Sequence, residues 1–263
     1  MGHVPCRRGL NRGFRPLSVQ VTKTRLVAID GVAGAGKSTA GALLAQRLGW
    51  TFFDTGILFR VACHLALSHG QPPYGEDLLA TLLEQMERDL DIRSDSRSDR
   101  DESLETQVLL DGCDVTAALR REAVDRLLPV LSGLDPVRRS LTRMMRSMGR
   151  RLAEQAGVVV VGRDIGTTVF PEARVKFYLD AASDVRAHRR WRDLQARGLA
   201  VPLVQVHRDL VERDRLDSSR TNSPAARATD AFLIDTTSAG VDEVLAQLES
   251  VCRQILGHGI GAS

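Results

Sequence analysis

The chain has 263 residues, of which 43% are apolar, and this length suits one α/β domain, or one such domain with an insert. Its formal net charge of +3 is too small to indicate a nucleic-acid partner, and no apolar run approaches the roughly 20 residues that a membrane span requires. The four cysteines include no C-x-x-C pair, and the six histidines form no metal-ligand spacing with them, so we expect ordinary thiols in a soluble cytoplasmic protein.

The first 24 residues differ from the rest of the chain. They contain five basic residues and no acidic one, with several glycines and prolines and no apolar periodicity. Such a composition is typical of segments that do not fold, and the apolar region of about 7 to 15 residues that a secretory signal needs is missing from them. We therefore expect residues 1–24 to be a disordered basic extension that precedes one domain over residues 25–263.

The next segment combines an apolar run, Leu26 to Ile29, with a glycine-rich turn that has the G-x-x-x-x-G-K-[ST] spacing of a phosphate-binding loop. Its glycines can take positive φ angles, so successive backbone N–H groups can converge on one anion. These amides open a helix predicted over residues 37–48, whose dipole also favours negative charge. The residues expected to hold ATP are Gly31, Val32, Ala33, Gly34, Ala35, Gly36, Lys37, Ser38 and Thr39.

Two side chains of this loop are expected to act on the nucleotide. Lys37 would reach the outer phosphates, and the Ser38 hydroxyl would be an oxygen ligand of Mg²⁺. A Rossmann dinucleotide loop fits less well, because Thr39 stands where its third glycine should be and the lysine has no use there.

From Arg25 onward, short apolar runs alternate with helical patterns, which predicts an α/β fold with parallel strands and crossover helices. Apolar residues recur at helical spacing over 136–155 and 241–256, and both stripes should face the core. The predicted strands are 26–29, 51–53, 158–161, 175–179 and 231–234.

The alternation breaks in two places. Between residues 70 and 133, two short strands are predicted at 89–93 and 107–110 around the polar stretch SDSRSDRDESLE, with helical pieces on either side. This block indicates an insert over one edge of the sheet. Residues 186–222 are rich in arginine and have few apolar positions, a pattern that indicates a mobile lid.

Polar segments follow the second and third strands of the predicted series. The first is DTGILFR, over residues 54–60, and the second is GRDIGT, over residues 162–167. Ligands of open parallel sheets bind at the carboxyl ends of the strands, so both segments should face the phosphate loop. A third segment, DRLDSSR, ends the arginine-rich stretch at residue 220.

Together these segments resemble those of bacterial cytidylate kinases, which phosphorylate CMP and dCMP from ATP. The similar segments are GVAGAGKST, DTGxxxR, GRDIGTxVFP and DRLDSSR, and within the insert VLLDGCDVT. The resemblance covers residues 25–250 and implies a P-loop nucleoside-monophosphate kinase with a five-stranded parallel sheet, a monophosphate-binding insert near 70–133 and a short lid near 186–222. It also implies ATP and Mg²⁺ as cofactors, CMP and dCMP as small-molecule substrates, no nucleic-acid or membrane partner, and a monomer.

The resemblance assigns roles to single residues. Arg163 and Asp164 match the pair that reads cytosine, where a carboxylate can accept from the N4 amino group while a guanidinium donates to the same edge. Asp217 matches a carboxylate that contacts the sugar. Arginines that hold the monophosphate match Arg60, Arg139 and Arg220. With Asp54 and Thr55, these residues make up the expected substrate site.

The catalytic group expected from the resemblance acts on the transferring phosphoryl group, whose charge its lysine and arginines neutralise. It consists of Lys37, Arg163, Asp164, Arg189 and Arg213, to which the lid can add Arg190. A monophosphate acceptor is already anionic near neutral pH, so no general base is needed. A hydroxyl acceptor would need one, and Asp54 is the obvious candidate.

Three positions depart from the family pattern. Val161 stands where the family usually has an acidic residue suited to the water shell of Mg²⁺, Phe59 stands where a tyrosine is common, and Val130 stands where a serine is expected near the substrate. Three interpretations stay open: a CMP and dCMP kinase, which we favour; a specialised phosphotransferase for another cytidylyl or small hydroxylated acceptor; and a non-catalytic nucleotide-binding protein. The retained Lys37 and Ser38 argue against the last.

Overall fold

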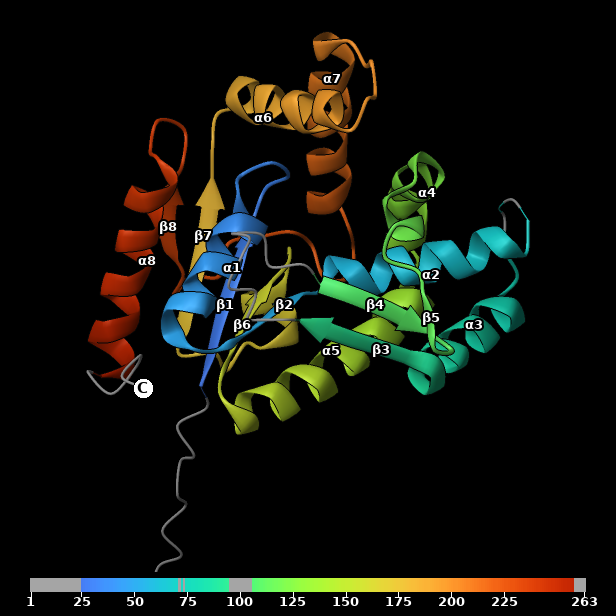
Figure 1. The fold of residues 1–263 in the computed structure, drawn as a ribbon, viewed down its shortest axis with the longest axis horizontal. Helices are drawn as coiled ribbons and strands as arrows, with labels where there is room; N and C mark the ends of the chain where they lie inside the picture. The colour runs from blue at the N-terminus through green and yellow to red at the C-terminus, as the bar shows by residue number, and fades with distance from the viewer. Residues whose placement is uncertain (1–24, 71, 73, 95–105, 258–263) are drawn as a thin grey trace, which may run out of the picture.

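The computed structural model describes residues 25–70, 72, 74–94 and 106–257, and its centre is a five-stranded sheet (Figure 1). All neighbouring strands of this sheet pair in parallel. Across the sheet the order is β2 (Thr51–Asp54), β6 (Val158–Val161), β1 (Leu26–Gly31), β7 (Val175–Asp180) and β8 (Phe232–Asp235). The predicted α/β class and the five predicted strands are confirmed.

Both faces of the sheet are covered by helices, and alternate residues of a strand enter different halves of the core. Leu26 and Ala28 pack with the helices of one face, whereas Val27 and Ile29 pack with those of the other. Strands buried on both faces read as continuous apolar runs, which explains the four valines of β6. The first face carries α2 (Gly56–Ser68) and α5 (Asp135–Gln155), and the second carries α1 (Lys37–Leu48) and α8 (Val241–Leu256).

The helices predicted over 136–155 and 241–256 correspond to α5 and α8. Val137 and Leu141 of the α5 stripe are fully buried, as expected. The α8 stripe is wrong at its first residue, because Val241 is 52% exposed and lines a cavity instead of the core. Val241 begins α8 at the rim of that cavity, whereas the core-facing side of the helix begins at Val244 and Leu245.

The insert forms a small unit beside the sheet, with a second, antiparallel sheet ordered β3-β4-β5. Sequence reasoning found β3 and β4 but missed β5, whose two residues are too few to show any alternation. Most of the polar stretch SDSRSDRDESLE, and all of residues 1–24, lie outside the described residues. The elements of the insert are α3 (Glu76–Asp89), β3 (Leu90–Ser94), β4 (Thr106–Leu110), β5 (Cys113–Asp114), the 3-10 helix η1 (Ala118–Arg120) and α4 (Glu122–Ser132).

The arginine-rich segment folds into two packed helices, α6 (Ser183–Ala196) and α7 (Leu203–Ser218), beyond the carboxyl ends of the central strands (Figure 1). We call this pair the lid. Its small core contains Ala187, Leu194, Val206 and Leu210 together with Ala33 of the phosphate loop. Those apolar positions are split between two helices, so no continuous stripe is visible in the sequence. Whether the lid moves stays a prediction.

Two expectations from composition agree with the described residues. Cys63 and Cys252 are buried and Cys113 is exposed, and all three are free thiols. Within residues 25–94 and 106–257, leaving aside 71 and 73, none of the helices combines the length and apolar character that a membrane crossing needs.

Candidate functional site

A cavity of about 610 Å³ lies at the carboxyl ends of the central strands, between the phosphate loop, the insert and the lid. Its wall includes the loop residues 33–39, the end of β2 with the start of α2, the segment 161–164 after β6, and arginines of the lid. The segments that sequence reasoning placed at strand ends therefore meet in one space. A parallel sheet produces this convergence, because all its strands end on the same side.

The phosphate loop has the backbone that its glycines predict. Gly31, Gly34 and Gly36 have φ angles of 146°, 77° and 84°. A Cβ at position 31 would lie 2.0 Å from the carbonyl oxygen of Leu179, so only glycine fits there. Gly36 is the N-cap of α1, and no side chain caps this helix. Its first amides thus remain available to an anion.

Positive side chains crowd around this loop. Lys37 Nζ donates to the carbonyl oxygen of Val32 at 2.7 Å, and its pKa is well below the usual range, first through burial and then through the charges of Arg163 and Arg213. Burial and the charge of Arg163 also lower the pKa of Arg213 to about 10. A bound polyanion would relieve this repulsion, so the cluster is suited to phosphate.

The second loop side chain, Ser38, meets the end of β2. Its hydroxyl donates to Oδ2 of Asp54 at 2.8 Å, while Oδ1 of Asp54 accepts from the backbone N–H of Gly56 at 2.9 Å. Thr55 is buried, and its hydroxyl donates to the carbonyl oxygen of Val161. The Val161 side chain is buried in the core formed with α1 and α8. The serine predicted to bind a metal therefore has a carboxylate next to it.

The predicted base-reading residue Asp164 is buried and forms an ion pair. Its Oδ2 atom lies 2.7 Å from Nη2 of Arg138, and the two side chains are 7% and 5% exposed. Arg138 also donates to the carbonyl oxygen of Ser132 at 3.1 Å, and its guanidinium lies 5.4 Å from the centroid of the Phe59 ring. The Nε atom of Arg138 is buried without a partner among the described residues. The ion pair with Asp164 therefore leaves this N–H group of Arg138 without a hydrogen-bond acceptor.

The structure corrects two positions on the acceptor side. Arg139 is exposed and does not line the cavity, whereas the preceding residue Arg138 does. One residue along a helix turns the side chain by about 100°, so a shift of one position moves it from the cavity to solvent. Val130 is 54% exposed, and Pro129 and Ser132 line the wall in its place.

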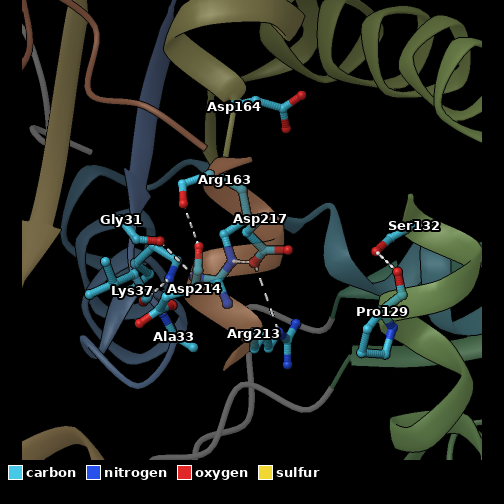
Figure 2. A network of polar contacts seen from close by, with 12 residues as sticks. Gly31, Ala33, Lys37, Pro129, Ser132, Arg163, Asp164, Arg213, Asp214 and Asp217 are labelled. Atoms are coloured by element: carbon cyan, nitrogen blue, oxygen red, sulfur yellow. Dashed lines mark hydrogen bonds and ion pairs between the residues drawn. The ribbon is translucent and has the colours of Figure 1, made fainter. Parts of the chain in front are cut away.

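Asp217 of α7 is the carboxylate to which three arginines converge. It forms an ion pair with Arg220, and its Oδ2 atom lies 3.2 Å from Nε of Arg163 and 3.9 Å from Nε of Arg213. Arg163 also donates to the carbonyl oxygen of Gly31 at 2.6 Å. Figure 2 shows this network beside the phosphate loop. It joins lid, loop and the segment after β6, and brings the predicted Arg163, Arg213, Asp217 and Arg220 together.

The remaining predicted arginines lie at opposite parts of the cavity wall. Arg60 donates to Oδ1 of Asp125 at 2.7 Å, on the insert side. Arg190 of the lid lies 3.3 Å from the other oxygen of the same carboxylate. Arg189 donates to the hydroxyl of Thr236 at 3.0 Å, and that hydroxyl donates to the carbonyl oxygen of Ala35 in the loop. The lid thus reaches both sides of the site.

Sequence reasoning missed a set of residues that hold the loop in place. Asp214 accepts from the backbone N–H of Ala33 at 3.0 Å, and Arg186 donates to the carbonyl oxygen of Ala33 at 3.0 Å and to Asp214. Asp214 lies within the DRLDSSR segment, so that motif was a signal for it. No such signal was present for Arg186, because nothing in the pattern distinguishes it from the other arginines of the same helix.

Asp30, also missed, connects the end of β1 to the segment that follows Asp164. Its carboxylate oxygens accept from the backbone N–H groups of Ile165 and Gly166, each at 2.7 Å, and its side chain is buried. These two residues begin the π-helical turn η2 (Ile165–Val169) directly after Asp164. Burial raises the pKa of Asp30 to about 6, against the lowering effect of the two N–H groups.

The cytidylate kinase family model matches residues 27–254 of the chain. The chain is 41% identical over 260 residues to the bifunctional pantoate ligase/cytidylate kinase of Synechococcus elongatus; this covers 99% of the chain but 47% of that protein, about half of its length. It is 38% identical over 234 residues to the cytidylate kinase of Citrifermentans bemidjiense, covering 89% of the chain and 95% of that protein. The cytidylate kinase of Geobacter sulfurreducens is 40% identical over 229 residues, covering 87% of the chain and 93% of that protein.

The raised pKa of Asp30 predicts a pH dependence of stability. An acid whose pKa is 3.8 when unfolded and about 6 when folded binds its proton more tightly in the folded state. Its contribution to the free energy of unfolding is therefore fully present below about pH 4, and about 3 kcal/mol of it is lost as the pH rises through about 6. Urea unfolding of the wild type and of Asp30→Asn from pH 4 to pH 7.5 measures this contribution.

The difference between the two proteins removes the ionisations that do not depend on Asp30 and leaves those of Asp30 and of the charges coupled to it, Asp164 and Lys37. We expect the stability of the wild type to fall relative to Asp30→Asn between pH 4 and pH 6.5. Two parallel curves would show that the carboxylate keeps an ordinary pKa.

Proposed function

The chain belongs to the cytidylate kinase family, and on that premise we propose that it transfers the γ-phosphoryl group of ATP to CMP and dCMP, giving ADP with CDP or dCDP. One observation carries this proposal: a single cavity joins a phosphate loop to a buried carboxylate–arginine pair, Asp164 and Arg138, through a set of converging arginines. The first part is suited to a triphosphate, the second to a base with an amino group, and the arginines to the phosphates between them.

The donor nucleotide occupies the loop side of the cavity. The amides at the start of α1 and the ammonium of Lys37 bind its phosphates. Ala239 and Val241 line the wall behind the loop, near Thr236 and Arg189. The half-exposed Val241 offers an apolar surface on which the donor base can rest.

The loop also fits Mg²⁺, which prefers oxygen ligands and usually keeps several waters in nucleotide sites. The Ser38 hydroxyl and the Asp54 carboxylate are such ligands and lie 2.8 Å apart. We propose that Ser38 holds the ion and that Asp54 holds its waters, in place of the acidic residue that the family usually has where Val161 stands. When bound, the ion neutralises charge on the phosphates. Within the described residues there is no group of three or more acidic, histidine or cysteine side chains that could hold a metal ion.

The acceptor base lies against Asp164. Its carboxylate accepts from the N4 amino group of cytosine, and Arg138, which has a free Nε donor, binds the acceptors on the same edge. Arg138 thus takes the place that sequence reasoning gave to Arg163. Uracil would set a carbonyl oxygen against the carboxylate and leave it unpaired, which costs about 1 to 3 kcal/mol.

The acceptor phosphate is held by guanidinium groups from three segments. Arg60 comes from α2, Arg163 from the segment after β6, and Arg220 from the segment directly after α7, and all three line the cavity. Planar guanidinium groups bind phosphate oxygens in pairs. Asp217 keeps two of these arginines, Arg163 and Arg220, in place and contacts the sugar.

The reaction then needs alignment and charge neutralisation. The acceptor phosphate has a second pKa of about 6, so its oxygen attacks without a general base. Lys37 and Arg213, of which the second lowers the pKa of the first through its charge, stabilise the charge on the transferring group together with Arg163. The lid excludes water from the site, so that the phosphoryl group passes to the nucleotide.

ADP release measured with MgATP over a panel of acceptors tests the function. We expect turnover with CMP and dCMP and much slower turnover with UMP and AMP, because uracil sets a carbonyl oxygen against Asp164, and adenine, although it has an amino group, is a larger two-ring base without the second carbonyl acceptor of cytosine. Fast phosphorylation of a small hydroxylated compound, with none of CMP, would favour the specialised phosphotransferase. Absence of ADP with every acceptor would favour a non-catalytic nucleotide-binding protein.

The substitution Asp164→Asn tests the role of the base-reading carboxylate. The amide keeps the shape of the side chain but loses the charge that pairs with Arg138 and one acceptor for the N4 amino group. We expect kcat/KM for CMP to fall by at least about 100-fold, corresponding to about 2.7 kcal/mol, while the dissociation constant of ATP stays within about 2-fold. Equal losses for both ligands would count against a cytosine contact, as would an unchanged preference for CMP over UMP.

The substitution Asp54→Asn tests the carboxylate proposed for the metal. We expect the affinity for Mn²⁺ in the ternary complex with ADP, measured by electron paramagnetic resonance, to fall by about 10-fold or more, because one charged oxygen partner of the metal waters is removed. ADP alone should bind with nearly unchanged affinity. As a control, Asp209→Asn changes an exposed carboxylate of the lid helix α7 that bonds only to Gln205 among the contacts described. Unchanged Mn²⁺ affinity in Asp54→Asn would exclude this role.

A further inference from the structure

A carboxylate of the insert, Asp125, lies between two arginines of the cavity wall. Its Oδ1 atom accepts from Nη2 of Arg60 at 2.7 Å, and its Oδ2 atom lies 3.3 Å from Nη2 of Arg190. Arg60 comes from α2 and Arg190 from the lid helix α6, whereas Asp125 belongs to α4 of the insert. One carboxylate therefore joins a proposed acceptor-phosphate arginine to the lid.

Stability alone does not explain this bridge. The side chains of Asp125, Arg60 and Arg190 are 23%, 25% and 33% exposed, and ion pairs that water still reaches contribute little to folding. The carboxylate also opposes the positive charge that a phosphate site needs. Its effect must therefore lie in the positions of the guanidinium groups.

Asp125 orients Arg60 without using up its donors. A guanidinium has five N–H groups, and in this structure Arg60 donates one to Asp125 and one to the carbonyl oxygen of Leu119 at 2.8 Å. The other donors remain for a phosphate. Two fixed contacts hold the planar group in one orientation, which lowers the entropic cost of binding an anion.

The lid meets the insert through a small number of polar contacts. Besides Arg190 and Asp125, Arg197 at the end of α6 donates to the carbonyl oxygen of Arg120. The lid also contacts Ala33 of the phosphate loop through its small core, Thr236 through Arg189 and Arg163 through Asp217, and its helix α7 lies against α4. The position of the lid therefore depends on the phosphate loop, which receives the phosphoryl-donor nucleotide. Asp125 connects the lid to Arg60, the arginine proposed to bind the acceptor phosphate.

We infer that Asp125 is a positioning residue that couples the two nucleotide sites: through its contacts with Arg190 and Arg60, ATP bound under the lid stabilises the orientation of Arg60 that receives the acceptor phosphate. This inference rests on the proposed function. Coupling of this kind is reciprocal, so the donor tightens binding of the acceptor by the same factor as the acceptor tightens binding of the donor.

Calorimetric titration of CMP, with and without a saturating non-hydrolysable ATP analogue and Mg²⁺, measures the coupling as the ratio of two dissociation constants. We expect this ratio to exceed about 5 in the wild type and to approach 1 in Asp125→Asn. Arg190→Gln, on a different element, should give the same loss, and the double variant should lose no more than either single one. The dissociation constant of the ATP analogue alone should stay unchanged in Asp125→Asn.

Glu122→Gln is the matched control. It lies on the same helix as Asp125, does not line the cavity and pairs with Arg126 at 3.4 Å, with both side chains more than half exposed. We expect it to keep the coupling ratio of the wild type, which separates the effect of Asp125 from a general effect of charge on α4.

The outcomes distinguish this inference from the proposed function. If the wild type binds CMP but the ratio is 1, or if Asp125→Asn and Arg190→Gln keep the ratio of the wild type, the coupling role is wrong and the proposed function stands. If the wild type binds neither CMP nor dCMP, the proposed function is wrong and the inference fails with it.

Discussion

Mutual repulsion among positive charges is the constraint on which the arrangement of this site depends. Lys37, Arg163 and Arg213 lie close enough for burial and mutual repulsion to lower the pKa values of Lys37 and Arg213. Such a cluster persists in a folded chain only when carboxylates hold its members in place. Asp217 does this for Arg163 and Arg213, and the site remains strongly attractive to phosphate because positive charge is still in excess.

Three carboxylates near the cavity connect segments that are distant in the sequence. Asp30 joins the end of β1 to the turn after Asp164, Asp214 joins the lid to the phosphate loop, and Asp125 joins the insert to both α2 and the lid. The central sheet brings the segments together but does not set the side-chain positions to within a hydrogen bond. These carboxylates provide that finer adjustment, because a hydrogen bond or an ion pair fixes the distance and direction between two groups.

The departures from the family pattern make sense once the side chains are placed. The Val161 side chain belongs to the core between the sheet and α1, and the carboxylate nearest to Ser38 is that of Asp54. Phe59 lies near the guanidinium of Arg138, where an aromatic ring attracts a cation and a hydroxyl is not required for that contact. Val130 is in solvent, so its lack of a hydroxyl leaves the wall of the cavity unchanged. None of the three removes a group that the proposed chemistry uses.

The sequence by itself determined the elements whose signals are local. The glycine spacing of the phosphate loop and the four valines of β6 depend on neighbours along the chain, and both predictions were confirmed. The sequence could not show that Arg138 and not Arg139 lines the cavity, or that Asp125 is the residue of α4 that contacts Arg60. Both facts depend on which side of a helix faces the cavity once the helix is packed. Only the tertiary structure decided those positions, since contacts between residues far apart in the chain leave no periodic trace in one sequence.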